Sequence, residues 1–146
     1  MKPIRVPVVH WEQSLRDAHP MWRYQAMEDD VLAVTVTDMD MDYLILCAVE
    51  EACYAAEYAF PFLVPADRRD VVGKLLHTVN RRLLLAAFSL DYSTGLVTCA
   101  ARHLCGESVP DDAWLNQIVE SVPDAVVAYG AYVIAAACYG FDTFEL

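Results

Sequence analysis

The chain has 146 residues, enough for one domain whose core needs no disulfide or metal to stabilise it. Ten Lys and Arg residues against 21 Asp and Glu residues give a net charge of −11, which argues against a nucleic-acid-binding protein, since such a protein needs a cationic surface. Hydrophobic residues make up 57% of the chain and the mean hydropathy is +0.28, so we expect a partner, most simply a second copy, to cover part of the apolar surface.

The N-terminal residues 1–21 are interrupted by prolines and lack the unbroken apolar run of a signal peptide. We treat them as an N-terminal segment with one short helix over 12–19 that Pro20 ends, and assign residues 22–146 to a single domain. Five cysteines without Cys-x-x-Cys spacing fit reduced core residues better than a disulfide or a metal set. They are Cys47, Cys53, Cys99, Cys105 and Cys138. We therefore expect a cytoplasmic protein.

Four strands are predicted between residues 22 and 60. Residues 22–27 alternate in polarity and residues 31–37 are β-branched, with a polar turn between them, so the pair predicts a hairpin. Residues 43–49 and 52–60 have the character of two further strands. The sequence leaves open whether Glu50 and Glu51 form a turn between these strands or a bulge in one long strand.

An Asp-x-Asp-x-Asp pattern occurs at residues 38–42, and calcium loops begin with this spacing because alternate side chains converge on one cation. Tyr43 stands where such a loop needs glycine, and Val49 stands where it needs a bidentate glutamate. We interpret residues 38–42 as a solvated turn.

The centre of the chain, residues 65–97, predicts a helix followed by a hairpin. Pro65 opens the helix, apolar residues recur at helical spacing between 71 and 79, and Asn80 ends it, because asparagine tolerates left-handed backbone angles. Residues 83–90 then predict a strand that follows almost without a loop. A tight turn over 92–95 leads to a second strand that ends at Leu104. Gly73 is a lone glycine inside this helix and forms no phosphate-binding loop.

The C-terminal part predicts helix. Pro110 and two aspartates open it, and Pro123 should kink it or start a new helix over 123–139 with Ser121 as the cap. Residues 125–139 carry no charge but are too few for a bilayer span, so we expect a buried core helix and no membrane span. Small residues at Gly130, Ala131 and Ala135 would let this helix approach the sheet closely, in preference to a second copy.

No sequence motif for catalysis, phosphate binding or metal binding stands out, so no cofactor is expected. His103 and Cys105 alternate on a strand and form the best candidate for a nucleophile and base. His77 fits a packed or half-exposed side chain. Arg68 and Arg69 fit a solvated face, although either could bind a carboxylate.

The centre of the chain resembles the bacterial YbjN-like family, whose members are described as sensory transduction regulators. The resemblance rests on Pro65, Arg69, Asn80, the Phe88–Asp91 segment and Gly95, and it extends over residues 22–140. The sequence departs from the family pattern before Phe88, where alanines replace a common glycine. The resemblance implies an α+β fold, similar to the type III secretion chaperones, in which an antiparallel sheet packs on helices in the order strands, helix, two strands, helix.

The resemblance assigns no catalytic residue, and the similar secretion chaperones are small, acidic, dimeric proteins that hold an extended segment of a client. We therefore expect a non-enzymatic, homodimeric interaction protein, chaperone-like or regulatory, with a protein client or partner. A regulator that binds a small molecule between sheet and helix is the alternative, and a hydrolase that uses His103 and Cys105 is a third.

Overall fold

The computed structural model describes residues 6–28, 30–50, 53–104, 106 and 109–146. Its elements in chain order are α1 (Val8–Ala18), β1 (Arg23–Glu28), β2 (Val31–Asp38), β3 (Met41–Val49), β4 (Cys53–Leu63), a short 3-10 turn (Ala66–Arg68), α2 (Arg69–Asn80), β5 (Ala87–Leu90), β6 (Leu96–Leu104) and α3 (Asp112–Cys138). The strands form one antiparallel sheet in the order β1-β2-β3-β4-β6-β5. The predicted α+β class and the predicted antiparallel sheet are confirmed.

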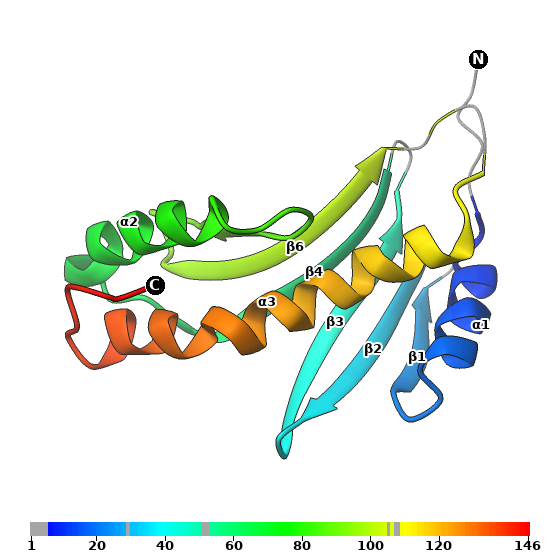
Figure 1. Cartoon of the computed structure of the whole chain (residues 1–146), viewed down its shortest axis with the longest axis horizontal. Coiled ribbons are helices and arrows are strands. Elements are labelled where there is room, and N and C mark those ends of the chain that lie inside the picture. The colour runs from blue at the N-terminus through cyan, green and yellow to red at the C-terminus, as the bar shows by residue number, and fades with distance from the viewer. Residues whose placement is uncertain (1–5, 29, 51–52, 105, 107–108) are drawn as a thin grey trace.

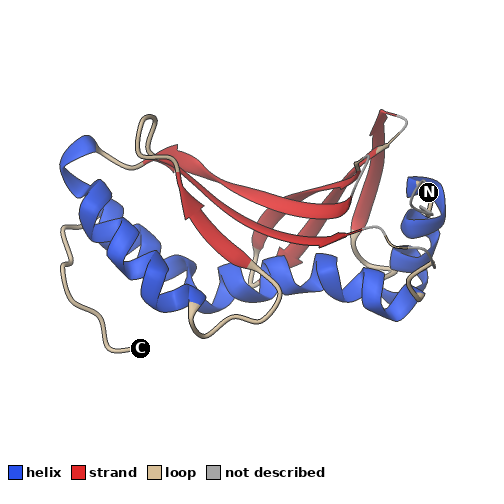
Figure 2. Ribbon diagram, turned by 90° about the horizontal axis from the view of Figure 1, so that it is seen from above, coloured by secondary structure: helices blue, strands red, loops and turns tan. Residues whose placement is uncertain are grey.

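The three helices of the described residues lie on the same face of the sheet, and none of these residues forms a helix over the opposite face, which we call the uncovered face (Figure 2). α3 crosses the strands diagonally, with α2 beside its C-terminal half and α1 beside its N-terminal half (Figure 1). Alternate strand residues such as Leu32, Ile45 and Val97 meet the helices and are fully buried. The core therefore forms one layer between sheet and helices, as period-two strands with one covered face require.

α1 begins directly after Pro7, four residues earlier than the predicted helix over 12–19. Trp11 and Leu15 are fully buried, and the indole N–H of Trp11 donates to the carbonyl oxygen of Leu115 at 3.2 Å. Proline at the residue before a helix starts it without losing a hydrogen bond. The described part of the N-terminal segment thus shares one core with the rest of the chain.

The β2–β3 turn over residues 38–42 is a two-residue hairpin loop. Met39 and Asp40 have φ values of 49° and 64°, and Asp38 pairs with Met41, which is the geometry of a type I′ turn. β3 and β4 pair antiparallel, so the Glu50–Glu51 region joins two separate strands and is not a bulge in one strand. Glu51 itself lies outside the described residues.

The first strand of the central hairpin is shorter than predicted. β5 contains only Ala87–Leu90, and residues 81–86 form turns and bends in place of the predicted strand over 83–90. The amide groups of Arg82 and Leu83 donate to the carbonyls of Val79 and Asn80, so turn hydrogen bonds continue beyond the helix end. Leu84 is fully exposed. The apolar residues at 83–86 were therefore not sufficient to predict a strand there.

α3 is a single helix of 27 residues that passes through Pro123, so the expectation of a new helix was wrong. Ser121 does not cap it, because its hydroxyl donates to the carbonyl of Ile118 inside the helix. Pro123 is buried, as are Val119 and Val122, and this packing outweighs the hydrogen bond that proline cannot make. Among the described helices, α3 alone has the length and composition to cross a membrane, but here its apolar residues supply core.

Candidate functional site

Four of the six residues that mark the family resemblance meet at one corner, where the chain enters α2 beside the β5–β6 turn. Pro65 precedes the 3-10 turn in extended conformation. The Arg69 guanidinium donates from Nε to the Val64 carbonyl at 3.0 Å and from Nη1 to the Tyr92 carbonyl at 2.9 Å. The Val64 amide donates to the Gly95 carbonyl at 2.8 Å. Arg69 therefore ties the helix entrance to the turn.

Gly95 and Asp91 shape the turn itself. Gly95 has a φ of +86°, and a Cβ there would lie 2.3 Å from the Val64 carbonyl oxygen, so the turn requires glycine. Asp91 Oδ1 accepts from the Ser93 amide at 2.9 Å and from its hydroxyl at 2.6 Å, and these hydrogen bonds lower the pKa of Asp91. Gly73 of α2 lies against this turn, and a Cβ there would overlap the Tyr92 hydroxyl.

Asn80 and Phe88 meet at the other end of α2. Asn80 Nδ2 donates to the Phe88 carbonyl at 2.9 Å, and Asn80 Oδ1 accepts from the Phe88 amide at 2.8 Å. α2 ends at Asn80, as predicted, but not through a left-handed backbone, because among the described non-glycine residues only Met39 and Asp40 have positive φ. The side-chain amide of Asn80 instead makes the two backbone hydrogen bonds that a neighbouring strand would make with Phe88 of β5. The six residues are thus a structural framework around α2, β5 and β6.

Arg68 does not form a solvated face, and that expectation was wrong. Its side chain is 19% exposed, and Nη1 lies 2.8 Å from the Asp142 carboxylate. Nε and Nη2 donate to the carbonyls of Ala136 and Phe141 at 2.8 and 2.7 Å. The alternative that Arg68 binds a carboxylate is confirmed by Asp142, but the sequence could not name these partners, because they lie about seventy positions away along the chain. Arg68 holds the end of α3 and the segment after it against the start of α2.

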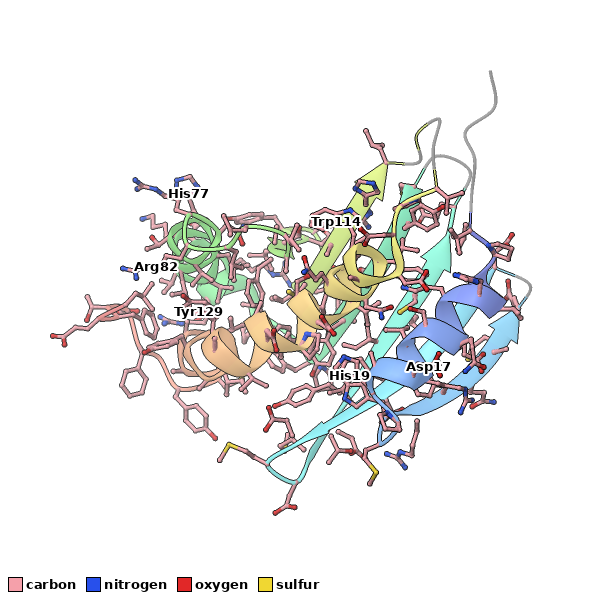
Figure 3. All side chains as sticks on the ribbon, turned by 45° about the vertical axis from the view of Figure 1, so that its right-hand side comes forward. Asp17, His19, His77, Arg82, Trp114 and Tyr129 are labelled. Atoms are coloured by element: carbon pink, nitrogen blue, oxygen red, sulfur yellow. The ribbon has the colours of Figure 1, made fainter. Side chains whose placement is uncertain are left out.

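The candidate catalytic pair gains no support from the described residues. His103 Nδ1 accepts a hydrogen bond from the indole N–H of Trp114 at 3.0 Å, and its ring stacks with that of Tyr54. Cys105 lies outside the described residues. His77 points outward from α2 (Figure 3), and Cys47 and Cys99 are buried. Burial raises the pKa of both thiols, to about 12 for Cys99, so neither is a ready nucleophile.

An acidic group of side chains lies where α1 meets α3. His19 Nε2 is 2.5 Å from Glu120 Oε2, and its ring stacks on Trp22 with the planes 1° apart. Burial, then Glu120 and Asp38, raise the pKa of the Asp124 carboxyl, and His19 opposes them. Within the described ranges, no group of three or more His, Cys, Asp or Glu side chains could hold a metal ion. We therefore assign this group a structural role.

The uncovered sheet face is the first candidate binding surface. Leu44, Leu46 and Leu63 lie on it and are 53%, 44% and 61% exposed, because the opposite residues of β3 and β4 face the helices. Small residues, including Ala59 and Ala100, fill the positions between them. The ion pairs Arg23–Asp42 and Arg102–Glu57 also lie on this face. Glu57 lies directly opposite Leu46 on the neighbouring strand, so apolar and charged side chains are mixed on this face.

A groove between the sheet and α3 is the second candidate surface. It has a volume of about 350 Å³ and is lined by β3, β4 and the C-terminal half of α3. Its lining residues are Met41, Tyr43, Tyr58, Phe60, Pro61, Phe62, Val126, Val127, Gly130, Ala131, Ile134 and Cys138. Gly130 packs close to Phe60, as expected of a small residue that faces the sheet. The strand and helix predictions did not reveal the groove, because it depends on how β3 and β4 diverge.

No protein-family model matches this chain, and a search of curated proteins finds no match. The functional proposal therefore rests on the two apolar surfaces and on the framework residues.

Proposed function

We propose that this is a cytoplasmic, non-enzymatic protein of the YbjN type, chaperone-like or regulatory, which binds a segment of another protein through its apolar sheet and helix surfaces. The observation that carries the proposal is the uncovered sheet face with its exposed leucines, Leu44, Leu46 and Leu63. Large apolar side chains that are exposed on one face of a sheet favour an interaction surface. In this proposal α3 serves as a core helix and spans no membrane.

The mode of binding follows from the sheet. β1 and β5 are its outer strands, and an extended segment of a partner can add to such an edge through backbone hydrogen bonds. Two strands separate such an edge from Leu44, Leu46 and Leu63 on β3 and β4, so other residues of the partner would contact these leucines. A net charge of −11 keeps the apolar face soluble while no client is bound.

The test compares two double variants in pull-downs from the native cytosol. Leu44→Asp with Leu46→Asp places charge on the uncovered face, and Met21→Asp with Leu84→Asp does the same at two exposed apolar residues outside the sheet. We expect the wild type and the second variant to retain the same partner and the first variant to lose it. A wild type that retains no protein, or a first variant that retains the same partner, contradicts the proposal.

We also propose a homodimer, which the surplus of hydrophobic residues supports. Size-exclusion chromatography with light scattering should give twice the chain mass of 16.3 kDa. A mass that stays at that of one chain over a wide range of concentrations contradicts it.

A second candidate function is small-molecule binding, which the groove of about 350 Å³ favours because its volume and aromatic lining suit a small apolar ligand. An environment-sensitive apolar dye tests it. Ala131→Trp should displace the dye if the groove holds it, whereas unchanged dye binding excludes this site.

A further inference from the structure

The sheet divides between β3 and β4. These strands pair from Leu46 opposite Glu57 to Val49 opposite Tyr54. The preceding residues of β3, Met41–Ile45, pair with β2, and the following residues of β4 pair with β6. In Figure 1 the β2–β3 hairpin turns downward while β4 continues to the left. Two inner strand edges therefore face one another across an opening, which we call the fork.

Strand edges carry hydrogen-bonding groups that a further strand can use. Backbone N–H and C=O groups in a strand point alternately to its two sides, so part of each inner edge is directed into the fork. Among the strand pairings of the described residues, none joins Met41–Ile45 to β4. A segment that enters the fork can pair with β3 on one side and with β4 on the other.

The two sides of the fork differ in chemistry. On the helix side lies the groove, whose lining contains no charged residue and whose roof includes the small residues Gly130 and Ala131. On the uncovered side lies a second hollow of about 460 Å³, lined in part by Asp42 and Glu57. Tyr58 and Pro61 line both hollows. A strand in the fork would therefore meet only uncharged groups on one face, and two carboxylates beside Leu44 and Leu46 on the other.

Most charged side chains around the fork are acidic, although Arg102 on β6 lies 3.8 Å from Glu57. Residues 24–67, which include β3 and β4, contain no Lys, Arg or His, and neither do residues 104–146, which include α3. Asp38, Asp40 and Asp42 stand at the tip of the β2–β3 hairpin, beside the opening. Arg23 pairs with Asp42, but both side chains are more than half exposed, so the carboxylate remains open to a second cation.

We infer that the fork binds an extended segment of a partner protein in which apolar residues alternate with Lys or Arg. The apolar residues point to α3 and the basic residues point to Asp42 and Glu57, because successive side chains of a strand point to opposite faces. The inference rests on the proposed function, since it names the site and the chemistry of the segment that is bound.

The test uses synthetic peptides and the full chain. The probe is a fluorescent peptide of about nine residues, the length of a strand, in which Val and Lys alternate. One matched peptide replaces every Lys by Glu, and another carries N-methyl groups on alternate backbone amides. By fluorescence anisotropy we expect both matched peptides to bind at least about ten-fold more weakly, because one loses charge complementarity and the other loses strand pairing.

Two alanines on the same helix provide a matched pair of variants. Ala131 lines the groove, whereas Ala128 lines a different hollow formed by α3 and residues 82–86, and both are exposed. Ala131→Trp fills the groove and should weaken binding of the Val-Lys peptide at least about ten-fold, while Ala128→Trp should leave it within about two-fold. Asp40→Asn should weaken it by about two- to five-fold, and Asp17→Asn on α1 should have no effect.

Three results overturn the inference. The first is equal binding of the Lys and Glu peptides, and the second is equal loss in the two tryptophan variants. The third concerns the Ala131→Trp variant. If it changes the mass of the assembly, the groove binds a second copy of the chain. If it displaces the apolar dye but not the peptide, the groove binds a small molecule. If peptide binding fails while the Leu44 and Leu46 variant still loses its partner, the inference fails and the proposed function stands. If neither binding occurs, both fail.

Discussion

At the scale of single residues, several polar side chains act as substitutes for backbone partners. Asn80 takes the place of a neighbouring strand for Phe88, and Arg69 holds two carbonyls that lie in different segments. Such side chains satisfy backbone groups that would otherwise lack a partner near the core. Their removal should therefore cost more than the loss of an exposed hydrogen bond.

Asn80→Asp tests whether the hydrogen bonds between the Asn80 side chain and the Phe88 backbone stabilise the fold. Aspartate can accept from the Phe88 amide but cannot donate to the Phe88 carbonyl, so one hydrogen bond becomes a repulsion. We expect a loss of about 1–3 kcal/mol in the free energy of unfolding, measured by urea denaturation. Gln117→Glu, on the exposed side of α3, is the control for the change of amide to carboxylate. Equal stability of both variants and the wild type would show that Asn80 acts only as a helix end.

Gly95→Ala tests the turn. The positive φ of Gly95 and the contact with the Val64 carbonyl should make this variant at least about 2 kcal/mol less stable. Gly106→Ala is the matched control, because a Cβ at Gly106 meets nothing within 4 Å. Thermal unfolding of both variants measures the difference. A Gly95→Ala variant as stable as the control would show that the turn adjusts without cost.

At the scale of elements, tertiary contacts decide boundaries that local sequence does not. The residue pattern predicted β2, β3, β4, β6 and α2 closely, because these elements combine a clear period with turn residues at their ends. It failed at Pro123, where burial keeps α3 continuous, and at residues 83–86, where apolar residues stay outside the sheet. It also could not find the fork, since the divergence of β3 and β4 depends on how α3 packs across them. The six framework residues were singled out by the family resemblance and not by the residue pattern, and neither gave their contacts.

Arg68→Ala tests how α3 is joined to α2. The variant removes hydrogen bonds to Ala136, Phe141 and Asp142, so hydrogen exchange in residues 136–146 should accelerate and stability should fall by about 1–3 kcal/mol. Arg68→Lys should not restore either quantity, because one ammonium group cannot reproduce the guanidinium geometry. Arg81→Ala, at an exposed arginine, is the control. Unchanged exchange in Arg68→Ala would mean that core contacts alone hold the segment.

At the scale of the whole molecule, the surplus of hydrophobic residues divides between one helix-covered core and two surfaces that the fold leaves uncovered. The sheet has six strands, and its helices cover one face. The uncovered face and the groove carry some of the exposed apolar side chains, such as Leu44, Leu46, Val127 and Ile134, whereas Val9, Leu84 and Val109 lie elsewhere. Composition predicted that a surplus exists, but only the three-dimensional arrangement locates it.

Stability should fall in alkaline solution. Burial raises the pKa of Cys99 to about 12 and also raises that of Cys47, whereas an unfolded thiol has a pKa near 9.0. Above that pH the unfolded chain releases protons that the folded chain keeps, so the free energy of unfolding decreases as pH rises. At pH 10 each of the two thiols should lower the free energy of unfolding by about 1 kcal/mol relative to its value at pH 7. Urea unfolding between pH 7 and pH 10.5 measures the slope.

The control for this slope is Cys47→Ala with Cys99→Ala. This variant should be less stable at pH 7, because it loses buried volume, yet its stability should decrease less steeply with pH. An identical slope in wild type and variant would show that other groups cause the alkaline loss.

The absence of lysine and arginine from the walls of the fork has a practical consequence. Trypsin cleaves after these two residues, so even a fully unfolded chain yields residues 24–68 and 103–146 as two intact peptides that carry both sides of the groove. A basic partner segment would be cut wherever it is accessible. Digestion of a complex should therefore destroy the free part of the partner and leave the part that lies in the fork, still attached to walls that the protease cannot divide.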